Sequence, residues 1–296
     1  MSFTHSARYG FSSVLAALLV ACLAAPASAQ EAPGGPPDPN PGNLTFTGSI
    51  DFLNTYMFRG IRQDDTKLIV WPALDLGMSV YSGDGALKSV GLNVGSWNSL
   101  HTGSTGSDGP SGKLWYEGDF YASLGLGLGG GVSFGTTYTA YTSPNNMFST
   151  VKEIAFKLGV DDTPFLGRGA LKPYALVAFE LDAAPGLGQA DAGDNAGTYV
   201  ELGVAPGYAL PAASLTFPVK VGLSASDYYE LAGVDNKFGY FSVGGIVTVP
   251  LGGTSNFGAW NVHGGVEFQK LGDTTTAING GEDTKVIGSF GIGLSY

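Results

Sequence analysis

The last twelve residues, 285–296, read KVIGSFGIGLSY and alternate between two kinds of side chain. A period of two places the two kinds on opposite faces of a β-strand. This stretch therefore predicts a strand with one apolar and one polar face. The apolar set is Val286, Phe290, Ile292, Leu294 and Tyr296, and the small or charged set is Lys285, Ser289, Gly291, Gly293 and Ser295, with Ile287 as the exception.

The same period recurs from residue 44 onward. Between the two ends of this region, no uninterrupted apolar stretch reaches the roughly 20 residues that a membrane helix needs. At its start, Leu44, Phe46, Ile50 and Phe52 alternate with Thr45, Thr47, Ser49 and Asp51. The pattern predicts twelve strands: 44–60, 66–81, 88–99, 113–128, 130–142, 150–161, 172–182, 198–210, 215–226, 238–250, 259–270 and 285–296.

The expected connections between these strands alternate between long and short. The long segment 59–66 is followed by the short 82–85, and the long 100–112 by the short 129–130. Outer-membrane barrels alternate long outer loops with short periplasmic turns and hold an even number of antiparallel strands. We therefore expect an all-β fold: a transmembrane antiparallel up-and-down β-barrel of about twelve strands, with both termini periplasmic.

A soluble β-sandwich also alternates, but the composition favours the barrel. Only 13% of the residues are charged, whereas soluble surfaces carry about 25–35%. Glycine contributes 47 of the 296 residues, and the polar strand face consists mostly of Gly, Ser, Thr and Asn. The net charge of −11 argues against nucleic acid as a partner, because binding phosphates requires an excess of Lys and Arg.

The N-terminal region predicts export. Arg8 is followed by the apolar run 14–25 and by the small-residue site 27–29, which is the pattern of a signal peptide over residues 1–29. An alternative is lipoprotein processing at Cys22, the only cysteine of the chain. Residues 30–43 contain five prolines and predict an extended periplasmic tail. The barrel is then expected over 44–296.

Segment 49–63, SIDFLNTYMFRGIRQ, contains the pattern Tyr-x-Phe-Arg-Gly-Ile-x-Gln, and the next strand has an early proline, Pro72. This segment resembles the start of the TorF family of porin-like proteins, also called the Gcw_chp proteobacterial outer-membrane family. Beyond it, the resemblance is limited to strands and glycines. Two departures from the family pattern are Arg62 and the insertion 100–112. The resemblance implies an outer-membrane barrel.

The motif residues Tyr56, Phe58, Arg59 and Gly60 predict the outer end of the first strand. Tyr56 and Phe58 share the apolar parity, so we expect them in the aromatic girdle at the lipid headgroups. Arg59 has the opposite parity and is expected at the lumen mouth, either as a structural lock between strands or as a selectivity residue. Gly60 would let the chain leave the strand.

The polar parity of each strand predicts the pore lining. Acids outnumber bases by eight to four, and rings of Asp and Glu favour cations. Alternatively, the acids pair with the bases and plug the interior. The candidates are the acids Asp51, Asp75, Glu117, Asp119, Glu153, Glu180, Glu201 and Glu267, the bases Arg59, Lys157, Lys220 and Lys285, and His263.

Other chemistry has little support. The histidines after the signal peptide are His101, expected in a loop, and His263, expected as a hydrogen-bonded lumen residue. No pair of them has metal-ligand spacing, and no nucleophile–base constellation is visible. We therefore expect no metal, no cofactor and no enzymatic activity. The acidic loops are expected to be solvated, and the alternative is that they bind divalent cations or bridge them to lipopolysaccharide. They are Asp64 with Asp65, Asp182 with Asp191 and Asp194, and Glu282 with Asp283.

The sequence as a whole predicts a porin-like channel in the bacterial outer membrane. It would pass ions or small polar solutes by diffusion, with a preference for cations. The alternative is a plugged structural barrel that serves envelope integrity or surface interaction. Expected partners are outer-membrane lipid, lipopolysaccharide and, during biogenesis, the barrel-assembly machinery, which would recognise the terminal signal Phe290, Ile292, Leu294 and Tyr296.

Overall fold

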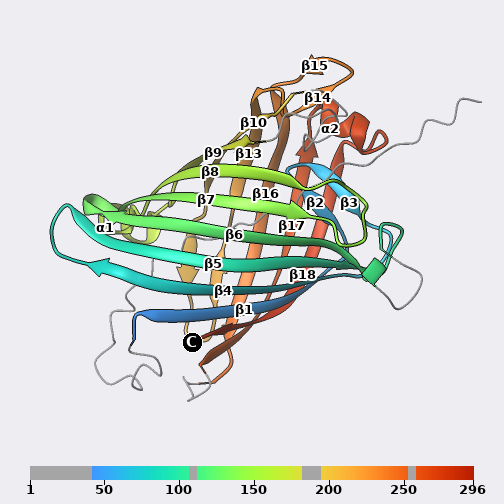
Figure 1. Cartoon of the computed structure of the whole chain (residues 1–296). Helices are drawn as coiled ribbons and strands as arrows, with labels where there is room; N and C mark the ends of the chain where they lie inside the picture. Colours follow the sequence, from blue (N-terminus) through green and yellow to red (C-terminus); the bar gives the residue numbers. More distant parts are fainter. Residues whose placement is uncertain (1–41, 107–111, 182–194, 253–257) are drawn as a thin grey trace, which may run out of the picture.

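The computed structural model describes residues 42–106, 112–181, 195–252 and 258–296. Twelve antiparallel strands form a closed barrel, in which each strand pairs with its neighbours in sequence and β18 pairs with β1 (Figure 1). The wall strands are β1 (Leu44–Leu53), β4 (Ile69–Ser82), β5 (Leu87–His101), β6 (Trp115–Leu128), β7 (Val132–Thr142), β8 (Val151–Val160), β9 (Tyr174–Glu180), β10 (Thr198–Val204), β13 (Val219–Ser226), β16 (Phe238–Pro250), β17 (Ala259–Leu271) and β18 (Thr284–Ser295).

Closure of the wall confirms the fold predicted from the period of two and excludes the sandwich. All twelve predicted segments contain a wall strand, and their boundaries move by a few residues except in the first segment and in 198–210, whose wall strand already ends at Val204. Two short strands, β11 (Gly207–Ala209) and β12 (Ser214–Thr216), follow β10 in the chain and form a hairpin in which β12 pairs with β16. Pro206 and Pro218 mark the interruptions, because proline cannot donate a ladder hydrogen bond.

The outer face of the barrel is apolar and exposed. On β1, Ile50 and Phe52 are 44% and 38% exposed, and on β4, Leu74 and Leu76 are 55% and 56% exposed. Large apolar side chains in this position are stable against lipid and not against water. Among the described residues, no helix has the length and apolar character needed to cross a membrane.

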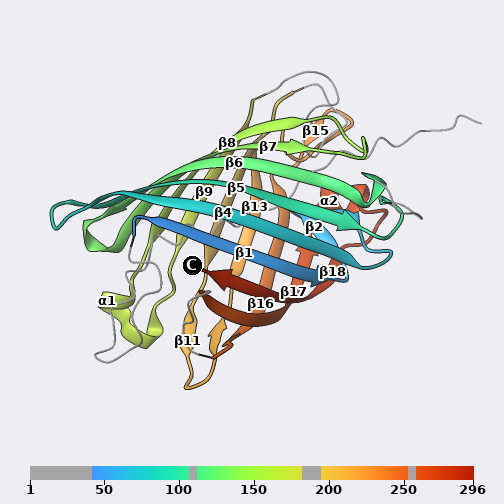
Figure 2. The same ribbon diagram turned by 60° about the horizontal axis from the view of Figure 1, so that its bottom comes forward.

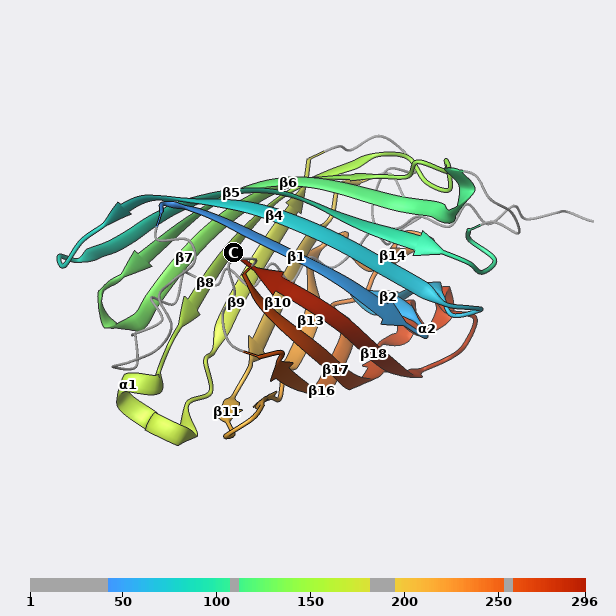
Figure 3. The same cartoon turned by 90° about the horizontal axis from the view of Figure 1, so that it is seen from below.

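The two ends of the barrel differ. At one end, here called the terminal end, β1 begins and β18 finishes, and the short helix α1 (Thr163–Leu166) and the β11–β12 hairpin lie there (Figures 2 and 3). The opposite end, here called the loop end, carries the small hairpin of β14 (Glu230–Leu231) and β15 (Val234–Asp235) and the helix α2 (Asp273–Ile278) (Figure 1).

The first strand is shorter than predicted. β1 ends at Leu53, and the chain then forms a separate two-stranded hairpin of β2 (Tyr56–Phe58) and β3 (Ile61–Asp64). We call residues 56–64 the lumen hairpin, because they lie inside the loop end of the barrel (Figure 1). Its turn has positive φ at Arg59 (45°) and Gly60 (83°), a conformation that glycine adopts at little cost.

Inward-facing glycines make room for tyrosine rings. A Cβ atom on Gly95 would collide with the Tyr121 ring of the neighbouring strand, and one on Gly203 would collide with the Tyr174 ring. The rings therefore lie close against the wall. Part of the high glycine content is thus explained by packing inside the barrel and not by turns.

The predicted signal peptide, 1–29, and most of the predicted periplasmic tail, 30–43, lie outside the described residues, as do Cys22, Asp182, Asp191 and Asp194. The structure places both ends of the barrel domain at the terminal end: Phe46 and Tyr296 exchange backbone hydrogen bonds of 2.6 and 2.8 Å. Which compartment that end faces stays a prediction.

Candidate functional site: the lumen hairpin and its anchors

The tip of the lumen hairpin is held by an ion pair. Arg59 donates from Nη1 to Glu153 Oε2 at 2.7 Å and from Nη2 to Glu153 Oε1 at 2.9 Å, and both side chains are almost fully buried. Nη1 also donates to the Tyr228 hydroxyl at 2.9 Å, and the guanidinium lies 4.0 Å from the centre of the Tyr199 ring. Such an ion pair is geometrically specific because each nitrogen meets its own oxygen.

The aromatic motif residues face inward. Tyr56 and Phe58 are fully buried, so their predicted place in the lipid-facing girdle is wrong. Tyr56 packs edge-on against Trp71, and its hydroxyl donates to Glu117 Oε2 at 2.9 Å. Phe58 packs edge-on against Tyr141. The parity rule fails here because the strand ends at Leu53, so alternation no longer refers to the wall.

The hairpin backbone is tied to α2 and to the β14–β15 region. Asn279, directly after α2, donates from Nδ2 to the Gly60 carbonyl at 2.8 Å and accepts from the Arg62 amide at 2.8 Å. The Tyr229 hydroxyl donates to the Arg59 carbonyl at 2.9 Å. The polar backbone of the turn is therefore satisfied inside the barrel, as a buried segment requires.

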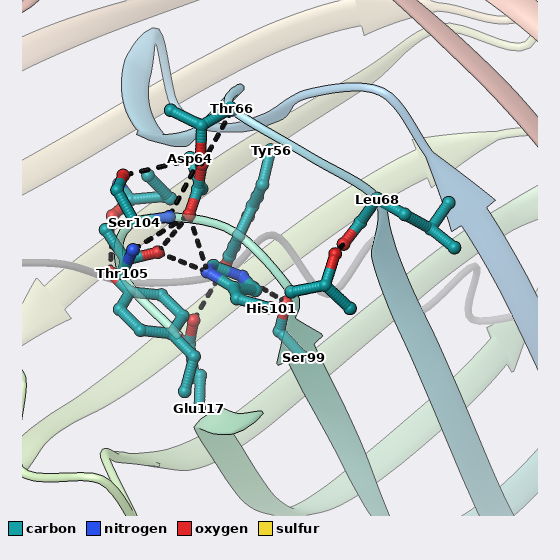
Figure 4. A network of polar contacts seen from close by, with 12 residues as sticks. Tyr56, Asp64, Thr66, Leu68, Ser99, His101, Ser104, Thr105 and Glu117 are labelled. Carbon is teal, nitrogen blue, oxygen red and sulfur yellow. Dashed lines mark hydrogen bonds and ion pairs between the residues drawn. The ribbon is translucent and has the colours of Figure 1, made fainter. Parts of the chain in front are cut away.

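The other end of the hairpin is fixed by a chain of hydrogen bonds that centres on Asp64 (Figure 4). Asp64 accepts from the amide and hydroxyl of Thr66 through Oδ1 and from those of Thr105 through Oδ2. Burial raises the pKa of Asp64, but the hydrogen bonds from Thr105 and Thr66 outweigh it and hold this pKa below its usual value.

These contacts determine which atom donates and which atom accepts in each hydrogen bond of the chain. Because the Thr105 hydroxyl donates to Asp64, its oxygen must accept from His101 Nδ1, 2.6 Å away. His101 Nε2, 2.7 Å from the Ser99 oxygen, must then accept from Ser99, which itself accepts from Trp71 Nε1 at 2.9 Å. The geometry therefore implies a neutral imidazole protonated at Nδ1.

Contrary to the loop prediction, His101 is the last residue of β5, and its side chain is fully buried. Its order with Ser99 and Asp64 resembles a nucleophile–base–acid arrangement, which sequence reasoning did not find because Asp64 lies on β3, far in sequence from Ser99 and His101 on β5. Ser99 is fully buried as well, and its oxygen is already bonded to Trp71. The arrangement works as a clamp between the hairpin and β5.

The predicted acids of the loop-end half are buried. Glu117 and Asp119 are fully enclosed, Glu153 holds Arg59, and Glu180 accepts from the Gly197 amide at 2.6 Å. Glu201 accepts hydrogen bonds from three hydroxyl groups, those of Tyr174 at 2.7 Å, Tyr199 at 2.6 Å and Tyr240 at 2.9 Å.

Toward the terminal end, the predicted residues are only half-buried. Asp51 Oδ1 lies 2.6 Å from His263 Nε2, and Lys220 lies 3.7 Å from Glu267. Asp75 is held by neutral donors, Asn93 Nδ2 at 2.6 Å and the Tyr121 hydroxyl at 2.8 Å, whereas Lys157 Nζ lies 4.3 Å from the centre of the Tyr174 ring. The interior is therefore closely packed at the loop end and more accessible toward the terminal end.

A polar cavity of about 700 Å³ opens beside the hairpin at the loop end, lined in part by Asn54, Asp65 and Lys285. Lys285 pairs with Asp65 at 2.5 Å and with Glu282 at 2.9 Å. The hydrogen bond from Lys285 lowers the pKa of Glu282, and Asp283 pairs with Lys270. These acidic residues are thus engaged in ion pairs. Among the described residues, no cluster of three or more His, Cys, Asp or Glu could hold a metal ion.

A closed barrel with an apolar outer face and a polar, charged interior defines an outer-membrane type of β-barrel. Neither a protein-family model nor a curated protein matches the sequence. Among solved structures, the COG4313 outer membrane channel from Pseudomonas putida F1 is similar over 89% of this chain and 100% of its own, with 12% identity and a TM-score of 0.46.

Two further barrels are similar at a lower level. A Pseudomonas aeruginosa FadL homologue matches over 86% of this chain and 90% of its own, with 7% identity and a TM-score of 0.38. The OmpF of Salmonella typhi, in complex with daunomycin, matches over 86% and 97%, with 10% identity and a TM-score of 0.37.

Proposed function

We propose that this protein is a porin-like channel of the bacterial outer membrane, through which ions or small polar solutes diffuse. The observation that carries the proposal is a gradient in the exposure of inward-facing side chains along the barrel. On β1, the inward-facing Thr45 and Thr47 are exposed, Ser49 and Asp51 are half-buried, and Leu53 is buried. The lumen is thus a polar vestibule that narrows toward the hairpin.

The charges of the vestibule support a preference for cations. The carboxylate of Asp75 is half-buried and accepts hydrogen bonds from neutral groups. These hydrogen bonds stabilise the carboxylate form of Asp75 and bring no positive charge to it. In a narrow, low-dielectric bore such a charge attracts cations more strongly than it does in bulk water.

The plugged barrel is a second candidate, favoured by the anchoring of the lumen hairpin. Arg59 serves there as the lock between elements that the sequence allowed, and its ion pair with Glu153 is buried. In this case the barrel would support the envelope and pass no solute. Either function is compatible with lipopolysaccharide as a partner and with the barrel-assembly machinery, which would act on the strand that ends in Tyr296. Either function is also compatible with membership of the TorF family, which we propose from the Tyr56–Gly60 motif.

Single-channel recording in planar lipid bilayers tests the channel. Discrete conductance steps and a cation-selective reversal potential across a salt gradient are expected. Asp75→Asn should move the reversal potential toward zero, with a smaller effect at high salt because the charge is screened. Asp84→Asn, in the exposed turn between β4 and β5, is the matched control. Purified, folded barrels that give no conductance would instead support the plugged barrel.

A further inference from the structure

The barrel wall has an unpaired strand edge at the loop end. β18 pairs with β1 only as far as Leu53 opposite Ser289, but it continues to Thr284. Its other edge is paired with β17 over that whole length. The Asn54 amide still donates to the Gly288 carbonyl at 3.3 Å, so residues 284–287 have a ladder on one side only, as far as the described residues show.

A single side chain covers part of this edge. Asn54 accepts from the Gly288 amide through Oδ1 at 2.7 Å and lies 3.5 Å from the Val286 carbonyl through Nδ2. The polar cavity of about 700 Å³ lies along the same edge, because Thr284, Lys285 and Val286 line it together with Asn54. The cavity thus occupies the place of a missing piece of strand.

The missing piece has the length of the segment that enters the lumen. If the register of Leu53 with Ser289 is continued, Tyr56 falls opposite Val286 and Phe58 falls opposite Thr284, the last residue of β18. Continuing the pairing with β4 on the other side places Phe58 opposite Asp64. An extended β1 could therefore fill the gap beside β18 in the existing register, and β4, which begins at Ile69, would extend toward Asp64 to pair with it.

The side chains of this segment also suit the wall. Phe52, Tyr56 and Phe58 share one parity, and Phe52 already faces outward with 38% of its surface exposed. In an extended β1, Tyr56 and Phe58 would face lipid near the end of the barrel, where aromatic girdles lie. The same residues therefore suit two positions, one in the lumen and one in the wall.

We propose that residues 54–58 exchange between these two positions and that the lumen hairpin is the closed state of a gate. In the open state, β1 extends to Phe58, Arg59 leaves Glu153, and the turn moves out of the lumen. The gate rests on the proposed channel function, whereas the exchange of position can be measured without any conductance.

Disulfide trapping tests the exchange in the full chain with Cys22→Ser. The pair Tyr56→Cys/Val286→Cys should form a disulfide on oxidation, because only the extended strand brings the two side chains together on the outer face. The pair Met57→Cys/Lys285→Cys tests the next position on the inner face. Met57→Cys/Val286→Cys places the thiols on opposite faces and is the matched control. Heat-modifiable migration on gels shows that each variant is folded.

Conductance is then recorded before and after oxidation. The trapped protein should conduct more than the reduced protein, and reduction should reverse the change. Glu153→Gln leaves Arg59 buried without its counter-charge, so it should raise the ratio of open to closed molecules by about a hundredfold or more and speed cross-linking accordingly.

Three results would overturn the gate. In the first, folded barrels of both test pairs form no more disulfide than the control. In the second, the disulfide forms but conductance is unchanged in a protein that conducts, which leaves the channel standing without the gate. In the third, the disulfide forms and neither state conducts, in which case the proposed channel function fails while the exchange of position stands.

Discussion

Arg59 and Glu153 join the tip of the lumen hairpin to the barrel wall through two hydrogen bonds of 2.7 and 2.9 Å, with side chains only 6% and 3% exposed. Arg59 belongs to a turn that leaves the wall, whereas Glu153 lies on β8. The pair therefore holds together two parts of the chain that are not neighbours in the sheet.

Removal of this arginine should destabilise the barrel. Arg59→Gln leaves Glu153 buried without a counter-charge, which typically costs about 3–5 kcal/mol. Denaturant unfolding in detergent, followed by tryptophan fluorescence, measures the change. Arg168→Gln, in an exposed segment at the terminal end, is the control. The double variant Arg59→Gln/Glu153→Gln should recover part of the loss, and equal midpoints for Arg59→Gln and wild type would refute the ion pair.

The anchor at Asp64 predicts a dependence on pH. Its pKa is lower in the folded state than in the unfolded chain, where an Asp titrates near 3.9. Its contribution to stability is therefore fully present above about pH 5 and is lost as the pH falls through the folded-state pKa. Wild type should be more stable than Asp64→Asn at pH 7, and this difference should shrink at pH 3. Asp84→Asn should show no such difference, and a constant gap for Asp64→Asn would contradict the assignment.

The terminal strand predicts an assembly defect. Tyr296 exchanges backbone hydrogen bonds with Phe46 and is 42% exposed. Deletion of Tyr296, or Tyr296→Asp, should lower the amount of protein in the outer membrane, because the closing strand loses the aromatic residue that we propose as its assembly signal. Tyr208→Asp changes a tyrosine of similar exposure, 43%, in the β11–β12 hairpin and serves as the control. Quantitative blotting of outer-membrane fractions measures the amount of each variant, and equal levels for the Tyr296 variants and the control would refute the prediction.

Closure of the ladder predicts heat-modifiable migration on gels. Every wall strand is paired on both edges over most of its length, so unfolding requires breaking many backbone hydrogen bonds that lipid or detergent cannot replace. Unboiled protein in mild detergent should therefore migrate differently from boiled protein. The same mobility for both samples would contradict a closed barrel.

The period of two was sufficient to predict the barrel from the sequence. Along β1 and β18, the lipid-facing and lumen-facing side chains differ so strongly in size and polarity that strand and parity follow from the residues alone. The parity of Asp51 and His263 led to the prediction of inward-facing positions, but not to the prediction that the two residues meet. Their contact depends on the register between β17, β18 and β1, which alternation does not encode.

The lumen hairpin could not be predicted in this way. Segment 54–58 has the same alternation as the rest of β1, so a local pattern assigns it to the wall. Its observed position is decided by distant partners, Glu117 for Tyr56 and Glu153 for Arg59. The chain of hydrogen bonds from Trp71 to Asp64 was not predicted for the same reason, because its residues lie on three separate elements. The one signal of the lumen hairpin in the sequence was Arg59, a charged residue of lumen parity directly before Gly60.

The contact between Phe46 and Tyr296 has a consequence for biogenesis. The first wall strand can gain its second partner only after β18 has been made, because β18 closes the wall against β1. The pairing of β18 with β1 therefore closes a very long loop and waits for the late synthesis of β18. Long-range pairings of this kind form slowly. A ribosomal product that stops short of β18 would keep two open strand edges exposed to periplasmic proteases. Completion of the ladder thus acts as the molecule's own quality control, in which only chains that contain β18 become sealed.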